Sequence, residues 1–296
     1  MKSDSPEGTV SWGDVLREAT ERFNQSGFSE MEARWLVEEV ASCELVGASL
    51  NDLVSNRQMA LYDNLLLRRL GGEPLQYVLG HWQFRDLDLM VDQRVLIPRP
   101  ETETVVSHIL NEVDRHGGEV FVADLGTGSG AIGLSIALER SLTRVWCTDL
   151  SEEALSVAKA NLAGLGQPAR RVSLCHGSWF NALPESLKGK LHVVASNAPY
   201  IPTTEVLPTE VKDWEPSLAL YGGAGGTDHL EKIIEESIPW LTPQGSLVLE
   251  ISPDQAGAMS ELATSAGFNE VLVLSDLADK PRSLVARKLC LIALLT

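Results

Sequence analysis

The sequence is short of positive charge. Its 296 residues contain 24 Lys and Arg against 41 Asp and Glu, which gives a net charge of −17. The shortage holds on both sides of Pro98, with 9 basic and 16 acidic residues up to that position and 15 and 25 after it. Proteins that bind duplex DNA take most of their affinity from Lys and Arg on phosphates. We therefore expect no direct nucleic-acid partner.

Cysteine is scarce and scattered. Cys43, Cys147, Cys175 and Cys290 form no CxxC pair, and none has a His at ligand spacing. A disulfide framework or a zinc site requires such clustering. We expect no metal, reduced thiols in the core and a cytoplasmic location.

Long apolar runs are absent as well. The longest, residues 289–295, is far shorter than the ~20 residues of a membrane-spanning helix, so no membrane association is expected. This run either extends the last strand or forms a tail, and the sequence leaves both open. Residues 1–8 carry no apolar stretch behind Lys2, which predicts no signal peptide.

The length suits two domains, and residues 1–80 predict a small helical bundle. Ser11 is placed to cap a first helix, residues 29–32 have a capping-box pattern, and Gly71 is a helix-end signal. Three apolar series have helical spacing: Leu16, Ala19 and Phe23; Met31, Trp35, Leu36 and Val40; Leu61, Leu65, Leu66 and Leu70.

Residues 81–98 change to an alternating pattern, which predicts a hairpin linker. Its apolar positions are Trp82, Phe84, Leu87, Leu89 and Val91. The second domain covers residues 99–296. Pro100 suits the first turn of its opening helix, which directs Val105, Val106, Ile109 and Leu110 inward.

From Val120 onward, short apolar runs alternate with helical segments. The runs are residues 120–124, 145–149, 172–176, 193–197 and 247–251. Such alternation predicts an α/β domain, with a mostly parallel sheet and helices on both of its faces. Ligands of such sheets bind beyond the carboxyl ends of the strands, so residues at strand ends are the candidates for a site.

A glycine-rich loop follows the first run. Asp124 and Leu125 precede Gly126, Thr127, Gly128, Ser129 and Gly130. Alternate glycines let the backbone turn sharply and approach a ligand closely. Because Gly128, Gly130 and Gly133 also have GxGxxG spacing, the loop alone fits NAD, S-adenosylmethionine or a structural turn. The acid directly before the loop favours a cationic sulfonium over a pyrophosphate.

Two further strand ends carry candidate cofactor residues. Asp149 ends the second run, 25 positions after Asp124, where a carboxylate can accept hydrogen bonds from ribose hydroxyls. The alternative is an acid that only favours the start of the next helix. Trp179 and Phe180 follow the third run; one of them could cover an adenine face, whereas the other is expected in the core.

The fourth run ends in Asn197, Ala198, Pro199 and Tyr200. The Asn197 side-chain oxygen and the Ala198 carbonyl could accept both protons of a planar NH₂ group. Pro199 biases Ala198 toward an extended conformation, and Tyr200 offers an aromatic face. Methyl transfer to such a nitrogen needs alignment rather than a metal or an ionised base. Taken alone, the segment could also be a simple Asn-Pro turn.

These motifs, in this order, resemble the class I methyltransferases that modify planar nitrogens. Residues 72–80, 97–103, 215–220 and 249–251 further resemble the HemK/PrmC family, the glutamine methyltransferases of peptide chain release factors. The resemblance covers about residues 11–288. It implies a Rossmann-like class I methyltransferase domain, with a mostly parallel seven-stranded sheet, behind a small N-terminal helical domain that helps to dock the release factor.

The resemblance also implies residue roles. The S-adenosylmethionine site carries over to Gly126, Thr127, Gly128, Ser129, Gly130, Asp149 and Trp179, with Asn197 touching both cofactor and substrate. Asn197, Ala198, Pro199 and Tyr200 would bind the glutamine of a Gly-Gly-Gln motif, whose side-chain nitrogen receives the methyl group. The implied partners are the class I release factors.

Two positions depart from the family pattern. Ala198 stands where the family usually has proline, which keeps the carbonyl but loses the fixed φ. Gly225 stands where the family usually has an acid, with Asp228 three residues later. Rival hypotheses are an N6-adenine methyltransferase, a glutamine methyltransferase with another protein substrate, an NAD-dependent oxidoreductase and an inactive paralogue.

Overall fold

The computed structural model describes residues 10–289 and divides the chain into two units. The helical unit contains the described residues up to Gly80 together with Thr209–Trp214, and the sheet unit contains His81–Pro208 and the chain from Glu215 onward. Residues 1–9 and 290–296 lie outside the described residues, and with them Cys290 and all but Leu289 of the apolar run near the C-terminus. Within residues 10–289, no helix is long and apolar enough to cross a membrane.

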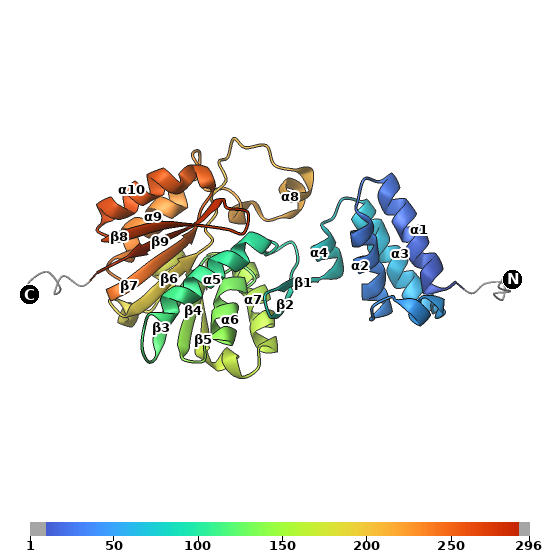
Figure 1. Ribbon diagram of the computed structural model, residues 1–296, viewed down its shortest axis with the longest axis horizontal. Helices are drawn as coiled ribbons and strands as arrows, with labels where there is room; N and C mark the ends of the chain where they lie inside the picture. The colour runs from blue at the N-terminus through green and yellow to red at the C-terminus, as the bar shows by residue number, and fades with distance from the viewer. Residues whose placement is uncertain (1–9, 290–296) are drawn as a thin grey trace, which may run out of the picture. The chain divides into compact units, whose positions relative to one another are not determined.

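The helical unit is a bundle whose helices begin and end at residues with capping chemistry. Ser11 and Asp14 form a reciprocal capping box, and α3 ends at Gly71. Ser29 caps α2, but no capping box forms there because Glu32 bonds Arg69 instead. The elements are α1 (Trp12–Gln25), α2 (Glu30–Ala41), η1 (Gly47–Asn51), α3 (Asn56–Leu70), α4 (Leu75–Leu79) and α8 (Thr209–Trp214) (Figure 1).

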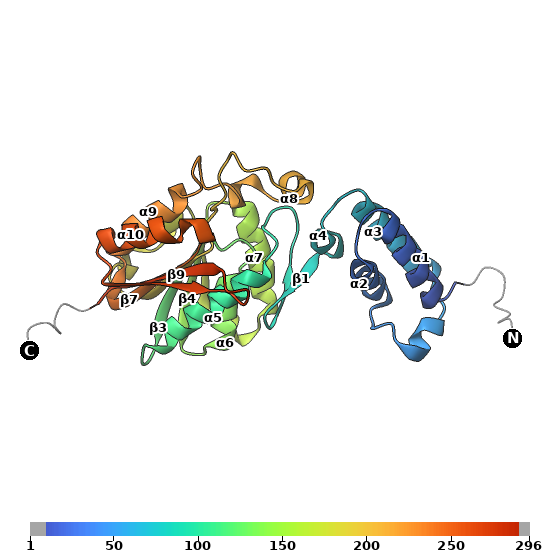
Figure 2. The same ribbon diagram turned by 45° about the horizontal axis from the view of Figure 1, so that its top comes forward.

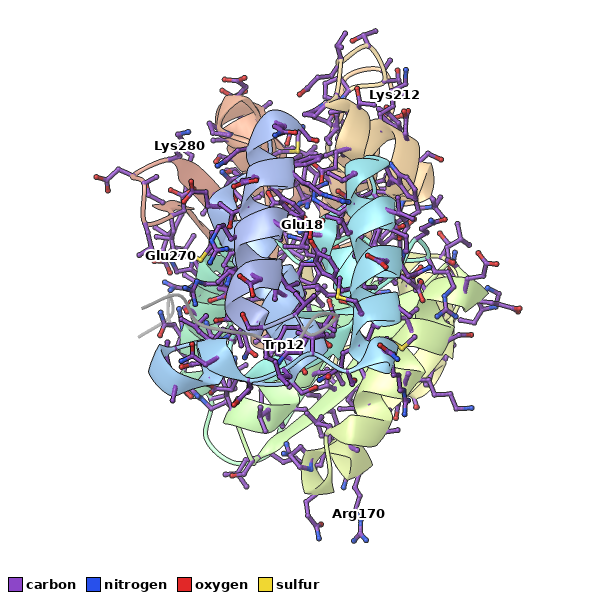
Figure 3. All side chains as sticks on the ribbon, turned by 90° about the vertical axis from the view of Figure 1, so that its right-hand side faces the viewer. Trp12, Glu18, Arg170, Lys212, Glu270 and Lys280 are labelled. Carbon is purple, nitrogen blue, oxygen red and sulfur yellow. The ribbon has the colours of Figure 1, made fainter. Side chains whose placement is uncertain are left out.

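The core of this unit confirms Ala19 and Phe23 as inward residues of α1, with Leu16 only partly buried, and corrects the inward face of α2. Val15, Ala19 and Phe23 are fully buried, whereas Met31 is 52% and Trp35 is 42% exposed. The buried stripe of α2 is Ala33, Leu36, Val37 and Val40, which has the i, i+3, i+4, i+7 spacing of one helix face. In the same way α3 buries Tyr62 and exposes Leu61. Charged side chains such as Glu18 on α1 lie on the outside (Figure 3).

Arg69 joins the elements of the helical unit through a buried guanidinium. Its side chain is 3% exposed and forms ion pairs with Glu32 of α2 at 2.7 Å and Glu210 of α8 at 2.8 Å. It also donates to the Glu73 carbonyl and lies 3.8 Å from the centre of the Phe28 ring. A distant segment of the chain is thereby attached to the bundle.

Arg69→Met should therefore lower the free energy of unfolding by about 1.5–3 kcal/mol, because two partly exposed carboxylates and the Glu73 carbonyl lose a charged hydrogen-bond donor. Arg17→Met is the matched control: Arg17 pairs with Asp14 on the surface, its side chain is 69% exposed, and its loss should change stability by less than about 1 kcal/mol. Urea denaturation of the full chain measures both. Equal effects of the two variants would contradict the role given to Arg69.

The sheet unit has a seven-stranded sheet with strand order β5-β4-β3-β6-β7-β9-β8. All neighbours from β5 to β7 pair in parallel, and β9 runs antiparallel to β7 and β8. The mostly parallel sheet is thus confirmed. The strands are β3 (Val120–Leu125), β4 (Thr143–Asp149), β5 (Val172–His176), β6 (Leu191–Ser196), β7 (Leu241–Glu250), β8 (Glu270–Ser275) and β9 (Pro281–Arg287).

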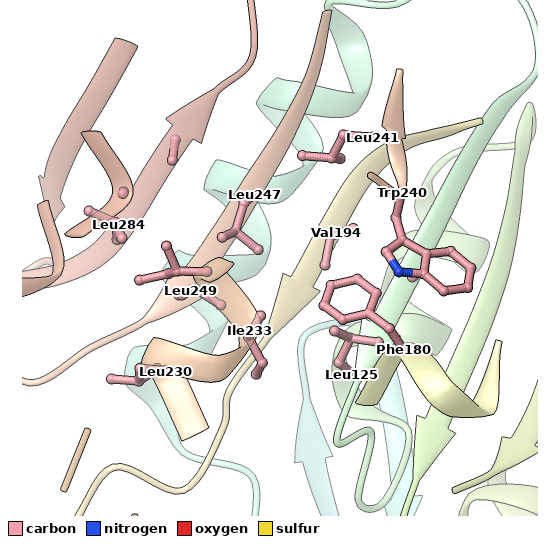
Figure 4. Close-up of a cluster of buried hydrophobic side chains, with 14 of the residues drawn as sticks. Leu125, Phe180, Val194, Leu230, Ile233, Trp240, Leu241, Leu247, Leu249 and Leu284 are labelled. Atoms are coloured by element: carbon pink, nitrogen blue, oxygen red, sulfur yellow. The ribbon is translucent and has the colours of Figure 1, made fainter. Parts of the chain in front are cut away.

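Helices cover both faces of this sheet (Figures 1 and 2). On one face lie α5 (Pro100–Asp114), α6 (Ala131–Glu139) and α7 (Glu152–Gly164), and on the other α9 (Asp228–Ser237) and α10 (Ala256–Ala266). Beneath α9, Ile233 packs into a cluster with Leu125, Val194 and Leu249 (Figure 4). Alternate residues of β3 (Ala123 and Leu125), β7 (Leu247 and Leu249) and β9 (Leu284 and Ala286) face this cluster, as the period of a strand requires. This packing fixes the strand ends that carry the candidate residues.

The hairpin predicted near residue 81 also forms. β1 (His81–Phe84) and β2 (Leu87–Met90) pair antiparallel, with Phe84 opposite Leu87. Pro100 occupies the first turn of α5, and Val105, Val106, Ile109 and Leu110 are buried as expected.

Candidate active site

A cavity of about 600 Å³ lies in the sheet unit beyond the carboxyl ends of the parallel strands. This is the position at which such sheets bind ligands. Its wall contains most of the predicted cofactor residues and the first residue of the strand-end motif: Gly126, Thr127, Gly128, Ser129, Asp149, Trp179 and Asn197. We call it the strand-end cavity.

The glycine loop has the backbone conformation that its sequence implies. Gly126, Gly128 and Gly130 have φ values of +73°, +56° and +91°, in the left-handed region that favours glycine. A Cβ at Gly126 would lie only 3.1 Å from the Trp179 ring. Gly130, the last glycine, caps α6 and is not part of the cavity wall.

Most N–H groups of the loop are already bonded inside the protein. Those of Gly126 and Thr127 donate to the Thr148 carbonyl, and that of Gly128 donates to Asp149 Oδ2. A pyrophosphate site at a helix N-terminus needs such groups to point at the phosphate. The geometry therefore disfavours a dinucleotide, which the GxGxxG spacing had left open.

Asp124 supports the loop from beneath and does not line the cavity. It is 1% exposed and accepts hydrogen bonds from Thr127 Oγ1 and from the Gly133 N–H. The interpretation that this acid faces a sulfonium is therefore wrong, because Asp124 is buried outside the cavity wall and its Oδ2 connects β3, the loop and α6. Burial raises the pKa of Asp124 to about 6.

Asp124→Asn should change how stability depends on pH. A carboxyl with a pKa of about 6 when folded and about 3.9 when unfolded binds its proton more tightly in the folded state. Its contribution is favourable at low pH and is lost as pH rises from about 4 to about 6. The difference in free energy of unfolding between Asp124→Asn and wild type should therefore shift in favour of the variant by up to about 3 kcal/mol as pH rises from about 4 to about 6.

Thermal unfolding at a series of pH values measures this effect. Asp114→Asn is the control, because its bonds to Arg140 lower the pKa of Asp114. The exposed Asp114 should show a small change of the opposite sign, with stability lost as pH falls. A wild-type and Asp124→Asn difference that stays constant from pH 4 to pH 6 would contradict the prediction.

Asp149 lies at the end of β4 with its carboxylate at the cavity wall. Oδ2 accepts from the Gly128 N–H and Oδ1 from the Ser151 N–H, both at 2.9 Å. Burial raises the pKa of Asp149, while these backbone bonds oppose the rise. Each carboxylate oxygen retains a further acceptor position, so the fixed carboxylate can still receive hydroxyl groups.

The two aromatic residues after β5 lie in different surroundings. Phe180 is 2% exposed and stacks on Trp240 with ring centroids 5.6 Å apart (Figure 4). Trp179 instead lines the cavity, with its ring 5.4 Å from that of His229. As expected, one aromatic residue belongs to the core and the other is free to face a ligand.

The strand-end motif contributes to the cavity unequally. Asn197 and Pro199 line it, whereas the Ala198 side chain is 1% exposed and packs in the hydrophobic cluster. Tyr200 is not part of the cavity wall; its hydroxyl donates to Glu250 Oε1 at 3.2 Å. Asn197 Nδ2 lies 3.3 Å from Thr102 Oγ1.

Sequence reasoning did not single out several residues that the structure brings to this site. Thr102 lies within residues 97–103 and Glu250 within residues 249–251, so the family resemblance marked both segments without giving either side chain a role. His229 and Lys232 on α9 line the cavity but belong to no motif.

The space beside Gly225, where the family usually has an acid, is open. A Cβ there would meet nothing closer than Thr227 Oγ1 at 3.8 Å. Asp228 packs directly over the α-carbon of Gly223 and lines the cavity. An acidic side chain thus reaches the cavity wall from this block.

The charges on the wall suit a zwitterion. Asp149, Glu153 and Asp228 are acidic, and Lys232 offers an ammonium group. Arg94 and Arg99 also line the wall, but each bonds a carboxylate of the protein. S-adenosylmethionine combines a sulfonium, an ammonium and a carboxylate, so these residues fit it. No three His, Cys, Asp or Glu side chains gather as a metal site anywhere in residues 10–289.

One cavity brings together the glycine loop, Asp149 and Asn197 at the strand ends of this sheet. This combination defines the class of the protein. The chain is a class I methyltransferase that uses S-adenosylmethionine. The PrmC N-terminal domain family matches residues 14–80, and the methyltransferase small domain family matches residues 101–211.

Comparison with known proteins narrows this class. A release factor glutamine methyltransferase from Bifidobacterium longum is 36% identical over 289 residues, covering 92% of this chain and 98% of its own. One from Moorella thermoacetica is 42% identical over 223 residues, covering 74% and 76%. A methyltransferase crystal structure from Pyrococcus furiosus shares the fold, with a TM-score of 0.51, 21% identity and coverage of 80% and 100%. The chain belongs to the release factor glutamine methyltransferase family.

Proposed function

We propose that the protein transfers a methyl group from S-adenosylmethionine to the side-chain amide nitrogen of the glutamine in the Gly-Gly-Gln motif of class I peptide chain release factors. Family membership supports this substrate. One observation in the structure carries the chemistry: Asn197 lines the same cavity as Asp149, Trp179 and the glycine loop. A side-chain amide is therefore present where an acceptor for a substrate NH₂ is needed.

The reaction requires orientation more than acid–base chemistry. An amide nitrogen is a poor nucleophile because its lone pair is conjugated with the carbonyl group. Two acceptors on its protons hold the nitrogen in place and increase its electron density; we assign these roles to Asn197 Oδ1 and the Ala198 carbonyl. Neither acceptor is a base, so the proton that the nitrogen loses passes to solvent.

The cofactor residues hold the second reactant. S-adenosylmethionine supplies an electrophilic methyl carbon, attached to a sulfur that leaves as a neutral thioether. We assign the ribose hydroxyls to Asp149, the adenine face to Trp179 and the close backbone approach to Gly126, Thr127, Gly128, Ser129 and Gly130. Fixing both reactants in one cavity supplies the proximity on which the rate depends.

Ala198 in place of proline should leave this chemistry intact. Its side chain is buried in the hydrophobic cluster, and Pro199 restricts its backbone from the other side. The carbonyl acceptor is retained at this position. Packing thus replaces part of the restraint that the family's proline ring provides.

We assign docking of the release factor to the helical domain, residues 1–80, and the catalytic work to residues 99–296, with residues 81–98 as the linker. Because release factors act in translation, we place the reaction in the cytoplasm. Substitutions of exposed residues on the helical unit, such as Trp35→Ala, should raise KM for a release factor more than KM for S-adenosylmethionine.

Intact-mass spectrometry of a release factor incubated with the protein and S-adenosylmethionine tests the proposal. The expected product carries one added methyl group on the glutamine of the Gly-Gly-Gln motif, located by peptide fragmentation. A release factor with Glu in place of that glutamine is the control and should gain none.

Competing functions give different results in a parallel assay with methyl-labelled cofactor. Label in DNA or RNA and none in release factors would establish the adenine methyltransferase instead. Label in a different protein would identify a paralogue with another substrate. No label anywhere, despite tight S-adenosylhomocysteine binding, would indicate a binding-only paralogue.

A further inference from the structure

Two buried polar side chains outside the strand-end motif, Thr102 and Glu250, form a hydrogen-bonded chain behind Asn197. Thr102, in the first turn of α5, is 3% exposed, and Glu250, the last residue of β7, is 1% exposed. Thr102 Oγ1 lies 2.7 Å from Glu250 Oε2 and 3.3 Å from Asn197 Nδ2. Tyr200 completes the group from the other side of the carboxylate, 3.2 Å from Oε1.

The direction of each hydrogen bond follows from counting protons. An ionised carboxylate only accepts, so both hydroxyl groups donate to Glu250. Thr102 has one hydroxyl proton, and the bond to Glu250 uses it. Thr102 Oγ1 must then accept from Asn197, which places the amide nitrogen of Asn197 toward Thr102. The Asn197 oxygen consequently faces away from Thr102 and is free for a group in the cavity.

The carboxylate has no ion-pair partner among the residues that the structure describes. Arg282 is the cation whose charge acts on Glu250, but its own hydrogen bonds go to Asp276. Burial of a carboxylate without a paired cation is unfavourable. Both of its hydrogen bonds go to side chains that contact or belong to the strand-end motif, so its position serves that motif.

We propose that Glu250 and Thr102 are positioning residues that fix the orientation of the Asn197 amide, with its oxygen turned to the substrate NH₂ and its nitrogen held by the Thr102 hydroxyl. The inference rests on the proposed function and adds two residues to it. Donation along the chain also polarises the amide, since linked hydrogen bonds strengthen one another. Asn197 Oδ1 thereby becomes a better acceptor for the proton of the substrate nitrogen.

Thr102→Val and Thr102→Ser separate this role from packing. Valine keeps the shape of threonine and removes the hydroxyl, whereas serine keeps the hydroxyl. Thr102→Val should lower kcat for release-factor methylation about 100-fold, the order of loss that follows misalignment of a reacting group. Thr102→Ser should keep kcat within about fivefold of wild type, and KM for the release factor should change little in either variant. Ser107→Ala, also on α5, is the control for a general disturbance of the helix and should leave kcat near wild type.

Glu250→Gln tests the charged end of the chain through the pH profile. Burial raises the pKa of Glu250. The hydrogen bonds from Thr102 and Tyr200 and the charge of Arg282 oppose this rise, whereas the charge of Glu101 adds to it. Wild-type kcat should fall on the acid side as Glu250 takes up a proton and the bond directions are no longer fixed. Glu250→Gln should be slow and should lack this acid limb.

A second measurement needs no substrate and therefore remains decisive if release factors are not methylated. The Asn197 side-chain NH₂ signal, identified in ¹⁵N-labelled protein by its loss in Asn197→Ala, should report a hydrogen-bonded proton in wild type and Thr102→Ser. In Thr102→Val this signal should move to the position of a solvent-bonded amide. An unchanged Asn197 signal in a folded Thr102→Val variant overturns the positioning role of Thr102 and Glu250. An unmethylated release factor together with the expected NMR shifts overturns only the proposed function.

Discussion

Asn197→Ala should reduce turnover about 1,000-fold while the protein still binds its cofactor. The estimate follows from the loss of a fixed polar group at the reacting centre, which typically costs 10²–10³ in kcat, combined with poorer alignment of the nitrogen. The Asn197 side chain lines the cavity with the glycine loop, but the loop is held by its own bonds to Thr148 and Asp149. The cofactor site should therefore survive the substitution.

Two measurements check this prediction. Single-turnover methylation of a release factor gives the chemical step, and calorimetry with S-adenosylhomocysteine gives cofactor affinity. Asn197→Asp should be as slow as Asn197→Ala, because a second carboxylate cannot donate to Thr102 Oγ1. Asn269, an exposed asparagine in the bend between α10 and β8, does not line the cavity, so Asn269→Ala should behave as wild type. Near-normal turnover of Asn197→Ala would show that Asn197 Oδ1 is not an acceptor for the substrate NH₂.

The parallel half of the sheet could be predicted because its signal is local. β3, β4 and β5 are short apolar runs between helical segments, and their predicted limits differ from the observed ones by two residues or fewer. β7 extends six residues further toward the N-terminus than the predicted run, through Thr242, Pro243 and Gln244. Only Leu241 is a buried apolar residue in this early part, and Pro243 and Gln244 are exposed, so it contains no apolar run.

β8 and β9 were not predicted individually. β8, at the edge of the sheet, contains only partly buried and exposed residues, which gives a weak apolar pattern. β9 has buried residues from Ser283 to Ala286, but its direction is set by pairing with both β7 and β8. Such pairing joins residues far apart in the chain, which a local pattern does not contain.

The strand-end residues of the site were accessible to sequence reasoning for a physical reason. Parallel strands place their carboxyl ends at one edge of the sheet, so the strand pattern of the sequence is enough to group Asp149, Trp179 and Asn197. Thr102 and Glu250 could not be grouped in this way. Thr102 lies in the first turn of a helix, and Glu250 ends an otherwise apolar run. Only the packing of α5 against β7 brings their side chains together.

Asp124 shows the opposite limit. Its place before the glycine loop indicated a ligand-facing charge, yet its carboxylate points to Thr127 and Gly133. The position of Asp124 in the chain indicates a strand end but not the direction of its side chain. The carboxylate faces the interior, where it lies against Gly133: a Cβ at Gly133 would be only 3.0 Å from Asp124 Oδ2.

The cysteines fit the prediction of core thiols only in part. Cys43 is exposed, whereas Cys147 is buried as expected of a core thiol.

Asp149→Ala should weaken S-adenosylhomocysteine binding about 100-fold, or about 3 kcal/mol, since hydrogen bonds to a charged group contribute about 1.5–3 kcal/mol each. The carboxylate is fixed by Gly128 and Ser151 and faces the cavity. Binding should also weaken as pH falls through the raised pKa of Asp149, because the protonated form accepts poorly. Calorimetry at several pH values measures both effects, and kcat at saturating cofactor should change much less than Kd.

Glu152→Ala is the matched control for this prediction. Glu152 is also an acid at the start of α7, but its side chain is 81% exposed and does not line the cavity. If Asp149 only stabilised the start of the helix, each substitution would cost about 0.3–1 kcal/mol of stability and neither would change Kd. Because Asp149 is partly buried at the cavity wall and Glu152 is not part of that wall, only the loss of Asp149 should reduce cofactor affinity. An unchanged Kd in Asp149→Ala would remove the ribose role and leave the carboxylate as a support for the loop.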